Sequence, residues 1–370
     1  MAQSVEGRPS ARRTVWTWLR LVVLALAVAY PAALLLVVLA LRRIGERWWL
    51  TTVALYLPRA GFGLPLPFLA LALTLVRPRR WLLTQVAASL LLVFPLMGLK
   101  LSGPRAPTAG AVHLRVMSCN IDLGSSSAAE LVAAIRSVDP DVVCLQEARG
   151  DEVRPLAEAL PGYTVRGDGQ FIVASKYAVT DVYAPPWLRH AGERHDPNFI
   201  RYRIAAPGGP LDLYNIHPVS PHGSFDRLIG GGLLHELASG RFFVNHEAFR
   251  KLERNATLRS LQVGAVAEHA AVSPYPVLNA GDTNLPSSSW ALGRYLGAYQ
   301  DGFAEAGRGF GYTFPARKKL AWLRLDRVLA DGHFRFLSFS RVDVHVSTHY
   351  PVLADLERTG TAGDKTTGDK

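Results

Sequence analysis

The first third of the chain is patterned in long uncharged apolar runs. Leu21–Leu41 has 21 such residues, enough at about 1.5 Å per residue to cross the hydrocarbon core of a bilayer as a helix. Trp81–Leu99 is a second run, of 19 residues, and Ala60–Val76 is a third, of 17 residues, that contains two prolines. We therefore predict a membrane module over residues 1–101, with three transmembrane helices at about 16–41, 60–76 and 81–99.

Two alternatives remain open in this region. The first run would fit a cleaved signal peptide, although it is longer than a normal signal core and further apolar runs follow it. Trp48–Leu57 is too short to cross a bilayer and is rich in aromatic residues, so we expect it to lie at a membrane interface. The alternative for the middle region is one long tilted or kinked helix.

From Val112 the pattern changes to short β-rich runs, each of which ends in or contains a polar residue. The runs are LRVMSCNI at 114–121, DVVCLQE at 141–147, LDLYNIH at 211–217, PVLNAGDTN at 276–284 and RLDRVL at 324–329. Helical periodicity is present at Ala128–Val138 and His246–Ala271. The pattern predicts a layered α/β domain over 112–358, reached through a Pro/Gly-rich linker at 102–111 and followed by a disordered tail at 359–370.

The net charge of +11 is distributed unevenly. Residues 1–110 hold 13 Arg and Lys but only two acidic residues, whereas residues 111–370 hold 28 of each sign. The basic residues therefore flank the apolar runs, as they do beside anionic headgroups, and the α/β domain has no bulk attraction for nucleic acid. With the N-terminus in the cytoplasm, seven positive charges flank the three spans on the cytoplasmic side and five or six on the external side. This difference slightly favours an external α/β domain.

Seven polar residues near the ends of the β-rich runs are candidate site residues. Taken singly, each has an ordinary explanation as a helix cap, an Asx turn, a satisfied core histidine or a surface ion pair. Together they fit metal-assisted phosphate chemistry, in which a carboxylate holds a divalent cation, an Asp activates water, and Asn and His donate to phosphate oxygens. They are Asn120, Glu147, His217, Asp282, Asn284, Asp326 and His349.

The wording and order of these segments resemble the endonuclease/exonuclease/phosphatase superfamily. The motifs SCNI, DPDVVCLQE, NIHPVSP, NAGDTN, RLDRVL and STHYPVLADL occur in that family's order over residues 112–358. The resemblance implies a four-layer α-β-β-α sandwich, two packed β-sheets flanked by helices, with the site at one end. The preceding helical module is similar to that of a bacterial membrane-bound branch.

The resemblance also implies a role for each residue. Glu147 would be the main metal ligand with Asn120 beside it, and Mg²⁺, or alternatively Mn²⁺, would be the ion. Asp282 would act as general base on the attacking water. The remaining residues would handle the phosphate: Asn284 and His217 by contact, His349 by stabilising the transition state, and Asp326 by orienting His349.

One position departs from the family pattern. The last motif usually has an Asp before the His, where this chain has Thr348 before His349. Loss of that carboxylate should weaken a second cation or move the pH optimum, and it favours a one-metal mechanism. It is also the only feature that favours a non-catalytic binding or sensor protein with the same fold.

Further candidates are less specific. Arg254 and Arg259 on the long helix, and Tyr312, are candidate substrate-binding residues, each with packing or a solvated surface as the alternative. The apolar stretch 222–244 is either a lid or membrane-touching loop, or simply a packed surface loop. Cys119 and Cys144 are expected to be buried thiols, and whether they pair stays open.

We therefore expect a multi-pass protein of the bacterial inner or plasma membrane. Its predicted function is hydrolysis of a phosphomonoester or phosphodiester, on a lipid-borne phosphate, by a metal- and Asp-activated water. The alternatives are a membrane-anchored nuclease and the non-catalytic protein. The expected partners are the phosphoester substrate and membrane lipid; nucleic acid is less favoured, and no protein partner is indicated.

Overall fold

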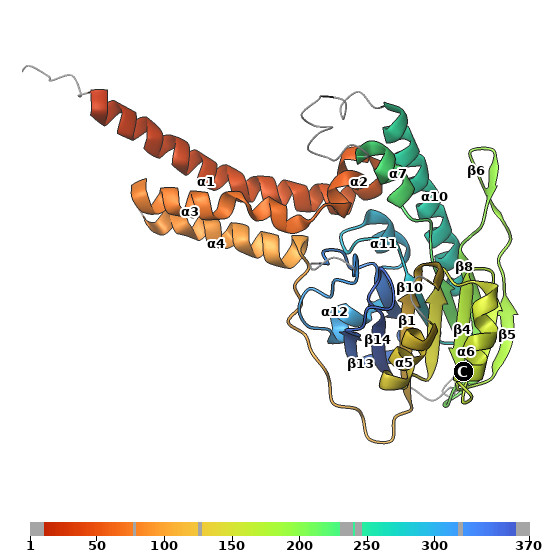
Figure 1. Ribbon diagram of the computed structural model, residues 1–370. Helices are drawn as coiled ribbons and strands as arrows, with labels where there is room; N and C mark the ends of the chain where they lie inside the picture. The colour runs from red at the N-terminus through yellow and green to blue at the C-terminus, as the bar shows by residue number, and fades with distance from the viewer. Residues whose placement is uncertain are drawn as a thin grey trace, which may run out of the picture. The chain divides into compact units, whose positions relative to one another are not determined.

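The computed structural model describes residues 11–76, 79–124, 128–229, 240, 246–316 and 321–359. The chain forms two compact units (Figure 1). The first comprises Met1–Ala40 and Pro58–Gly98, and the second comprises Leu41–Leu57 and Leu99–Lys370. The segment at 41–57 thus belongs with the α/β part, although it lies in sequence between the two pieces of the first unit.

The first unit is helical, and most of its large apolar side chains are exposed. Two of its segments, Thr14–Arg43 and Arg59–Val76, are long and apolar enough to cross a membrane. The predicted segment 81–99 is divided in the structure into a short α-helix and a π-helical turn that contains Pro95. The helices are α1 (Ala11–Arg43), α3 (Pro65–Val76) and α4 (Leu82–Leu91), with η2 (Arg59–Gly63), η3 (Arg79–Trp81) and the π turn η4 (Leu92–Leu96).

The second unit contains two mixed six-stranded sheets and a hairpin. The first sheet has the order β13 (Phe334–Arg341), β14 (Val352–Arg358), β1 (His113–Asn120), β2 (Val142–Gln146), β4 (Phe171–Ser175), β3 (Thr164–Asp168). The second has the order β11 (Gln300–Asp301), β12 (Asp326–Ala330), β10 (Val277–Asp282), β9 (Leu211–Ile216), β8 (Phe199–Ile204), β5 (Val179–Tyr183). The hairpin pairs β6 (Leu188–His190) with β7 (Glu193–His195).

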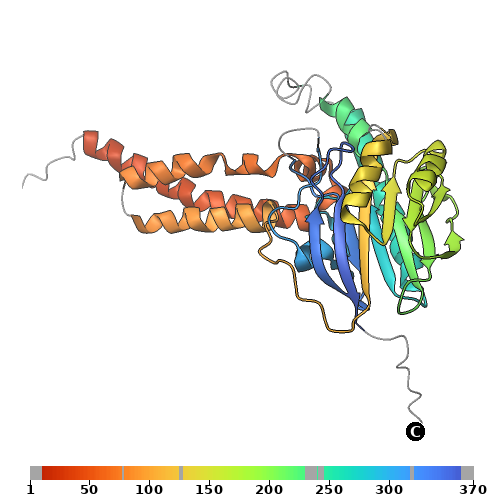
Figure 2. The same ribbon diagram turned by 60° about the horizontal axis from the view of Figure 1, so that its bottom comes forward.

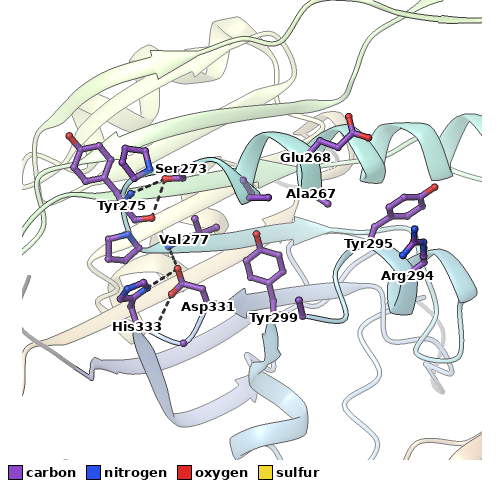
Figure 3. A pocket seen from close by; sticks show the side chains of 16 residues that line it. Ala267, Glu268, Ser273, Tyr275, Val277, Arg294, Tyr295, Tyr299, Asp331 and His333 are labelled. Carbon is purple, nitrogen blue, oxygen red and sulfur yellow. Dashed lines mark hydrogen bonds and ion pairs between the residues drawn. The ribbon is translucent and has the colours of Figure 1, made fainter. Parts of the chain in front are cut away.

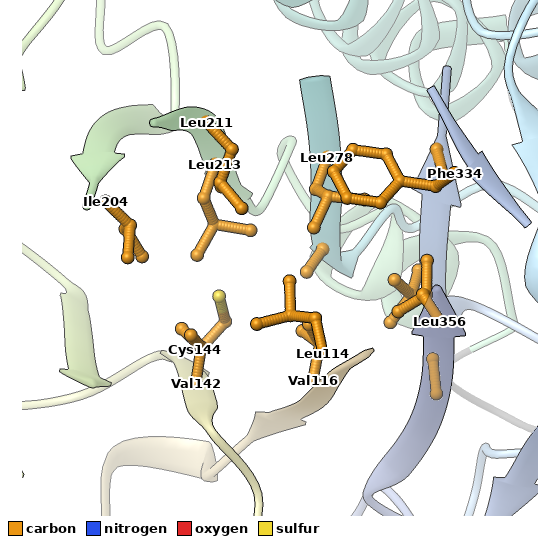
Figure 4. Packing of buried hydrophobic residues seen from close by; sticks show 14 of the residues in the cluster. Leu114, Val116, Val142, Cys144, Ile204, Leu211, Leu213, Leu278, Phe334 and Leu356 are labelled. Atoms are coloured by element: carbon orange, nitrogen blue, oxygen red, sulfur yellow. The ribbon is translucent and has the colours of Figure 1, made fainter. Parts of the chain in front are cut away.

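The sheets pack face to face through a shared apolar core. Leu114 and Val142 from the first sheet meet Leu213 and Leu278 from the second (Figure 4). Helices α5 (Ala128–Val138) and α6 (Val153–Ala159) cover the outer face of the first sheet, and α10 (His246–Ala271) and α11 (Trp290–Tyr295) cover that of the second (Figure 2). The four-layer sandwich is confirmed, and α5 and α10 have the predicted bounds. Shorter helices are η5 (Asp122–Gly124), η6 (Gly150–Glu152), α7 (His222–Ile229) and α12 (Gly302–Ala306).

The cysteines lie on opposite faces of the first sheet. Cys144 belongs to the core between the sheets, and Cys119 belongs to the core beneath α5. Both are free and fully buried, and burial raises the pKa of both thiols. Of the predicted lid or loop at 222–244, residues 230–239 and 241–244 lie outside the described residues, as does all of the predicted tail except Thr359.

Two parallel strand pairs determine where the polar strand ends meet. β1 runs parallel to β2 in the first sheet, and β9 runs parallel to β10 in the second. Parallel neighbours end at the same edge of a sheet, so the residues that follow these four strands gather at one end of the sandwich. These residues include Asn120, Glu147, His217 and Asp282.

Candidate active site

A cluster of polar side chains occupies this end of the sandwich, and it contains all seven residues that we singled out at the strand ends. The amide of Asn120 lies at its centre: its Nδ2 donates to Glu147 Oε1 at 2.9 Å and to Asp282 Oδ2 at 3.2 Å. The same nitrogen lies 3.4 Å from His217 Nε2. One side chain therefore joins the ends of strands from both sheets.

Glu147 provides the more solvent-accessible carboxylate of the site. It follows β2 with a positive φ of 51°, a conformation that is uncommon for a residue with a side chain and that turns the chain out of the strand. Its side chain keeps 28% of its surface exposed, and its Oε1 lies 3.3 Å from His217 Nε2. The hydrogen bond from His217, more than any other contact, lowers the pKa of Glu147 to about 2, so this carboxylate is ionised.

His217 is oriented by a residue that the sequence did not single out. The Nδ1 of His217 lies 2.6 Å from the Oε1 of Gln170, in the turn between β3 and β4. A carboxamide oxygen only accepts, so Nδ1 of His217 donates this hydrogen bond, while Nε2 donates the one to Glu147. His217 Nε2 is thereby directed toward Glu147 and Asp282.

Asp282 ends β10 deep in the site, with 1% of its side-chain surface exposed. Its Oδ1 accepts from the backbone N–H of Asn284 at 2.8 Å, which closes an Asx turn. Burial raises the pKa of Asp282, and the charge of Asp326 adds to this, against the opposing effect of His349. Asn284 has a positive φ of 49° and donates from Nδ2 to Pro218 O at 2.9 Å.

His349 and Asp326 form a buried pair beside Asp282. The Nδ1 of His349 lies 2.9 Å from Asp326 Oδ2, and its Nε2 lies 3.7 Å from Asp282 Oδ2. Burial alone would lower the pKa of His349, but the charges of Asp326 and Asp282 outweigh it and raise the pKa to about 9. The imidazole is therefore a cation that points its second N–H at the general-base candidate.

The donor set fits a divalent cation on the Glu147 side. Glu147 is the ionised carboxylate on the solvent-accessible side of the site. Glu147 supplies the carboxylate oxygens that Mg²⁺ prefers. Asn120 lies beside it with its amide nitrogen toward Glu147, and its Oδ1 accepts from the Asp122 N–H at 3.0 Å. Asp282, Asp326 and His349 also lie close enough to one another to hold a metal ion, but a cationic histidine carries a proton on both ring nitrogens and has no lone pair left for a metal.

The comparisons with known proteins agree with this layout. A model of the endonuclease/exonuclease/phosphatase family matches residues 117–349, which include every residue of the cluster. The chain belongs to this family. Members of the endonuclease/exonuclease/phosphatase family are phosphoesterases or nucleases, and the family is typically dependent on divalent metals.

Solved structures of family members resemble the chain at low sequence identity. An endonuclease/exonuclease/phosphatase from Beutenbergia cavernae is 18% identical, with a TM-score of 0.49, over 68% of this chain and 72% of that one. The mannosyl-6-phosphatase from Bacteroides thetaiotaomicron is 15% identical, with a TM-score of 0.47, over 66% and 99%. No curated protein matches the chain in sequence. Similarity at this level carries no information on the substrate.

The three weaker candidates lie outside the cluster. Arg259 is fully buried, and its guanidinium donates to Val219 O at 2.8 Å and Tyr56 Oη at 2.9 Å. Arg254 is exposed on α10. Tyr312 stacks on Phe310 with ring centroids 5.4 Å apart. The substrate role of these three residues stays a prediction.

The environment of His349 includes two supports that sequence reasoning missed. The ring of Phe314 lies 4.7 Å from the imidazole, centroid to centroid. Ser347 Oγ donates to Asn120 O at 2.5 Å and accepts from the His349 N–H at 3.1 Å. Neither Phe314 nor Ser347 is a candidate site residue by sequence alone, since Ser347 is only one letter of the STHYPVLADL motif.

A separate hollow of about 900 Å³ lies between the end of α10 and the loop after β12 (Figure 3). Tyr275, Tyr299, Asp331 and His333 are among the residues that line it. None of the seven clustered residues is part of its lining. The chemistry of the site is therefore at the strand ends, and this hollow is a different feature.

Proposed function

We propose that the chain is a divalent-metal-dependent phosphoester hydrolase that acts through the cluster at the strand ends. The observation that supports it most is the contrast between Asp282, a buried carboxylate with a raised pKa, and the cationic His349 held 3.7 Å from it by Asp326. A base and a cationic donor side by side suit the attack of water on a phosphorus whose oxygens gain charge.

Each residue then has a chemical task. Asp282 orients the attacking water and accepts its proton, while His349 donates from Nε2 to a phosphate oxygen. Asn284 and His217 contact the same phosphate. Glu147, with Asn120 beside it, would hold Mg²⁺, which would supply Lewis-acid chemistry and neutralise phosphate charge. The site offers no Ser or Cys nucleophile among these seven residues, so the attack of water needs no covalent enzyme intermediate.

We further propose that the substrate is lipid-borne and that the first unit anchors the protein in the membrane. Large apolar side chains such as Trp18, Leu36, Phe68 and Leu83 are at least half exposed on its helices. A soluble surface rarely carries so many, and a lipid bilayer would cover them. Residues 111–370 have equal numbers of acidic and basic residues, which disfavours a nucleic-acid substrate.

The test is hydrolysis by the full-length protein in detergent with Mg²⁺. The substrates are isoprenoid and glycerol lipid phosphates and sphingomyelin, compared with single- and double-stranded DNA and with a water-soluble phosphate ester. Glu147→Ala and His349→Ala should abolish turnover. The matched controls Glu158→Ala and His333→Ala, at exposed positions, should leave it unchanged.

The pattern of turnover separates the alternatives. Lipid turnover that both site variants lose supports the proposal as stated. Cleavage of DNA alone, with affinity that falls steeply with salt, would make the protein an anchored nuclease. Absence of turnover on every substrate would favour a binding or sensor protein and contradict the enzymatic proposal.

A further inference from the structure

A short segment that precedes the α/β domain by more than fifty residues in sequence is built into the active-site end of that domain. It contains η1 (Gly45–Arg47) and α2 (Trp49–Tyr56). The Trp49 ring stacks on Phe249 of α10 at 4.0 Å between centroids. Val53 is buried with Phe249 and Leu252. We had expected this segment at a membrane interface, but in the structure one of its faces packs on α10.

The N-terminal end of the segment contacts the loop between β10 and α11. Glu46 is 3% exposed, and its carboxylate accepts from the side chain of Ser289 and from the backbone N–H of Trp290 at 3.1 Å. These donors lie at the N-terminus of α11. Gly45 has a φ of +54°, and a Cβ there would lie 2.6 Å from Trp290 Cβ. Only glycine fits such an approach, so η1 is fitted closely to this loop.

The other end of the segment reaches a site residue directly. The hydroxyl of Tyr56 donates to the backbone carbonyl of Asn284 at 2.7 Å. The same hydroxyl accepts from Arg259 Nη1 at 2.9 Å. The backbone carbonyl of Tyr56 in turn accepts from the indole N–H of Trp322 at 3.0 Å. The tyrosine is therefore held on both its side-chain and its main-chain oxygens.

Arg259 extends this connection to the turn that carries His217. Its Nε donates to Val219 O at 2.8 Å, while Asn284 Nδ2 donates to Pro218 O in the same turn at 2.9 Å. The turn after β9 and the turn after β10 are thus tied together through Tyr56 and Arg259. The two hydrogen bonds that the buried guanidinium of Arg259 donates, to Val219 O and to the Tyr56 hydroxyl, are charge-assisted and therefore stronger than neutral ones.

We propose that Tyr56 is a positioning residue that sets the orientation of Asn284 toward the substrate phosphate. Asn284 has a positive φ of 49°, a conformation that asparagine adopts more readily than most residues with a side chain. The Asp282 carboxylate fixes the N–H of Asn284, and the Tyr56 hydroxyl fixes its carbonyl. This inference rests on the proposed function, because it takes Asn284 as a phosphate contact.

The test measures binding of inorganic phosphate to the full-length protein in detergent with Mg²⁺, by calorimetry, for Tyr56→Phe in two backgrounds. In the otherwise native chain we expect the dissociation constant to rise about fivefold, the effect of one hydrogen bond. In Asn284→Gly, which tolerates positive φ, the same change should have less than about a twofold effect, because Tyr56 acts through Asn284.

The matched control is Tyr163→Phe, since Tyr163 also donates to a backbone carbonyl, that of Pro140, at the opposite end of β2. It should leave phosphate affinity unchanged, although it removes an equivalent hydrogen bond. A second variant, Trp322→Phe, removes the contact to the backbone of Tyr56 and should weaken phosphate binding in the same direction, again only where Asn284 is present. It keeps the inference testable if Tyr56→Phe does not fold.

Three results would overturn the inference: unchanged phosphate affinity in Tyr56→Phe, an equal loss in both backgrounds, or no phosphate binding by the native chain. Failure of the proposed function looks different. If the native chain binds phosphate and shows the dependence on Asn284 but hydrolyses no ester, the positioning role stands and the enzymatic proposal is wrong.

Discussion

The side of the site that carries Glu147 and the side that carries Asp282 use the same functional group in opposite environments. Glu147 is 28% exposed and its pKa is lowered to about 2 by a hydrogen bond from His217. Asp282 is 1% exposed and its pKa is raised, first by burial. A permanently ionised carboxylate suits a cation, and a buried one of raised pKa suits proton transfer. The difference separates metal binding from base catalysis within one cluster.

The largest expected effect is on kcat, and it distinguishes the metal-binding role of Glu147 from the base role of Asp282. Asp282→Asn should lower kcat by about 10³-fold, because it removes the base, and added Mg²⁺ should not restore it. Glu147→Gln should also lower activity, but part of the loss should return as Mg²⁺ is raised, because that variant loses cation affinity. The measurement is kcat as a function of Mg²⁺ concentration, with Asp343→Asn, exposed on the surface, as the control.

Equal responses of the two variants to Mg²⁺ would contradict this division of roles. Rescue of Asp282→Asn by Mg²⁺ would specifically place the cation at the buried cluster of Asp282, Asp326 and His349, which also has suitable spacing.

The next largest effect is expected when the buried pair of His349 and Asp326 is broken. Asp326→Asn should lower kcat by about 10²-fold, because His349 loses both its orientation and its main charge partner. In the metal-free native protein the imidazole should titrate near pH 9, and in the variant at a lower pH. NMR titration of His349 measures both values, and an unmoved pKa in the variant would show that Asp326 does not hold the proton.

The raised pKa of His349 also determines how its contribution to stability depends on pH. The pKa of His349 is raised above its ordinary value of 6.5 to about 9. The charged imidazole therefore contributes its full stabilisation below about pH 6.5, and this contribution disappears as the pH rises through about 9. The high-pH limb of activity should move to lower pH in Asp326→Asn for the same reason.

The sequence predicted the elements well where one periodicity dominated. Ala128–Val138 and His246–Ala271 were predicted as helices and have those bounds, since each shows an apolar stripe at helical spacing. The polar residues at the ends of the β-rich runs lie close together in the candidate site, because parallel strands end at the same edge of a sheet. These signals are local, and each can be read from a single segment.

Contacts between residues far apart in the sequence could not be predicted in this way. The aromatic and apolar residues of Trp48–Leu57 suit a lipid interface and a protein surface equally, and the partner Phe249 lies about two hundred residues away. Gln170 is an ordinary turn residue until His217 is placed beside it. Arg259 lies on an amphipathic helix, where burial of its guanidinium depends on a partner hydroxyl from Tyr56.

A smaller effect, on the free energy of unfolding, is expected when the contact between Glu46 and the start of α11 is removed. Glu46→Ala leaves the donors at the start of α11 without their acceptor, so the free energy of unfolding should fall by about 1–3 kcal/mol. Chemical denaturation in detergent measures it, with Glu158→Ala, which removes an exposed carboxylate, as the control. An unchanged unfolding free energy would show that η1 is not part of the cooperative fold of the second unit.

The smallest effect is expected where a carboxylate is added. Thr348 is half-buried next to His349, and its backbone carbonyl accepts from the Ala316 N–H at 2.7 Å. Thr348→Asp would place a further negative charge near Asp282 and Asp326, which favours a second cation. Activity should stay the same or rise by a few-fold, roughly the effect of one partly exposed charge pair, and Mg²⁺ should bind more tightly. The control Thr348→Asn adds no charge and should change neither the activity nor the affinity for Mg²⁺. If Thr348→Asp alone abolished activity, the site would depend on a neutral residue at this position.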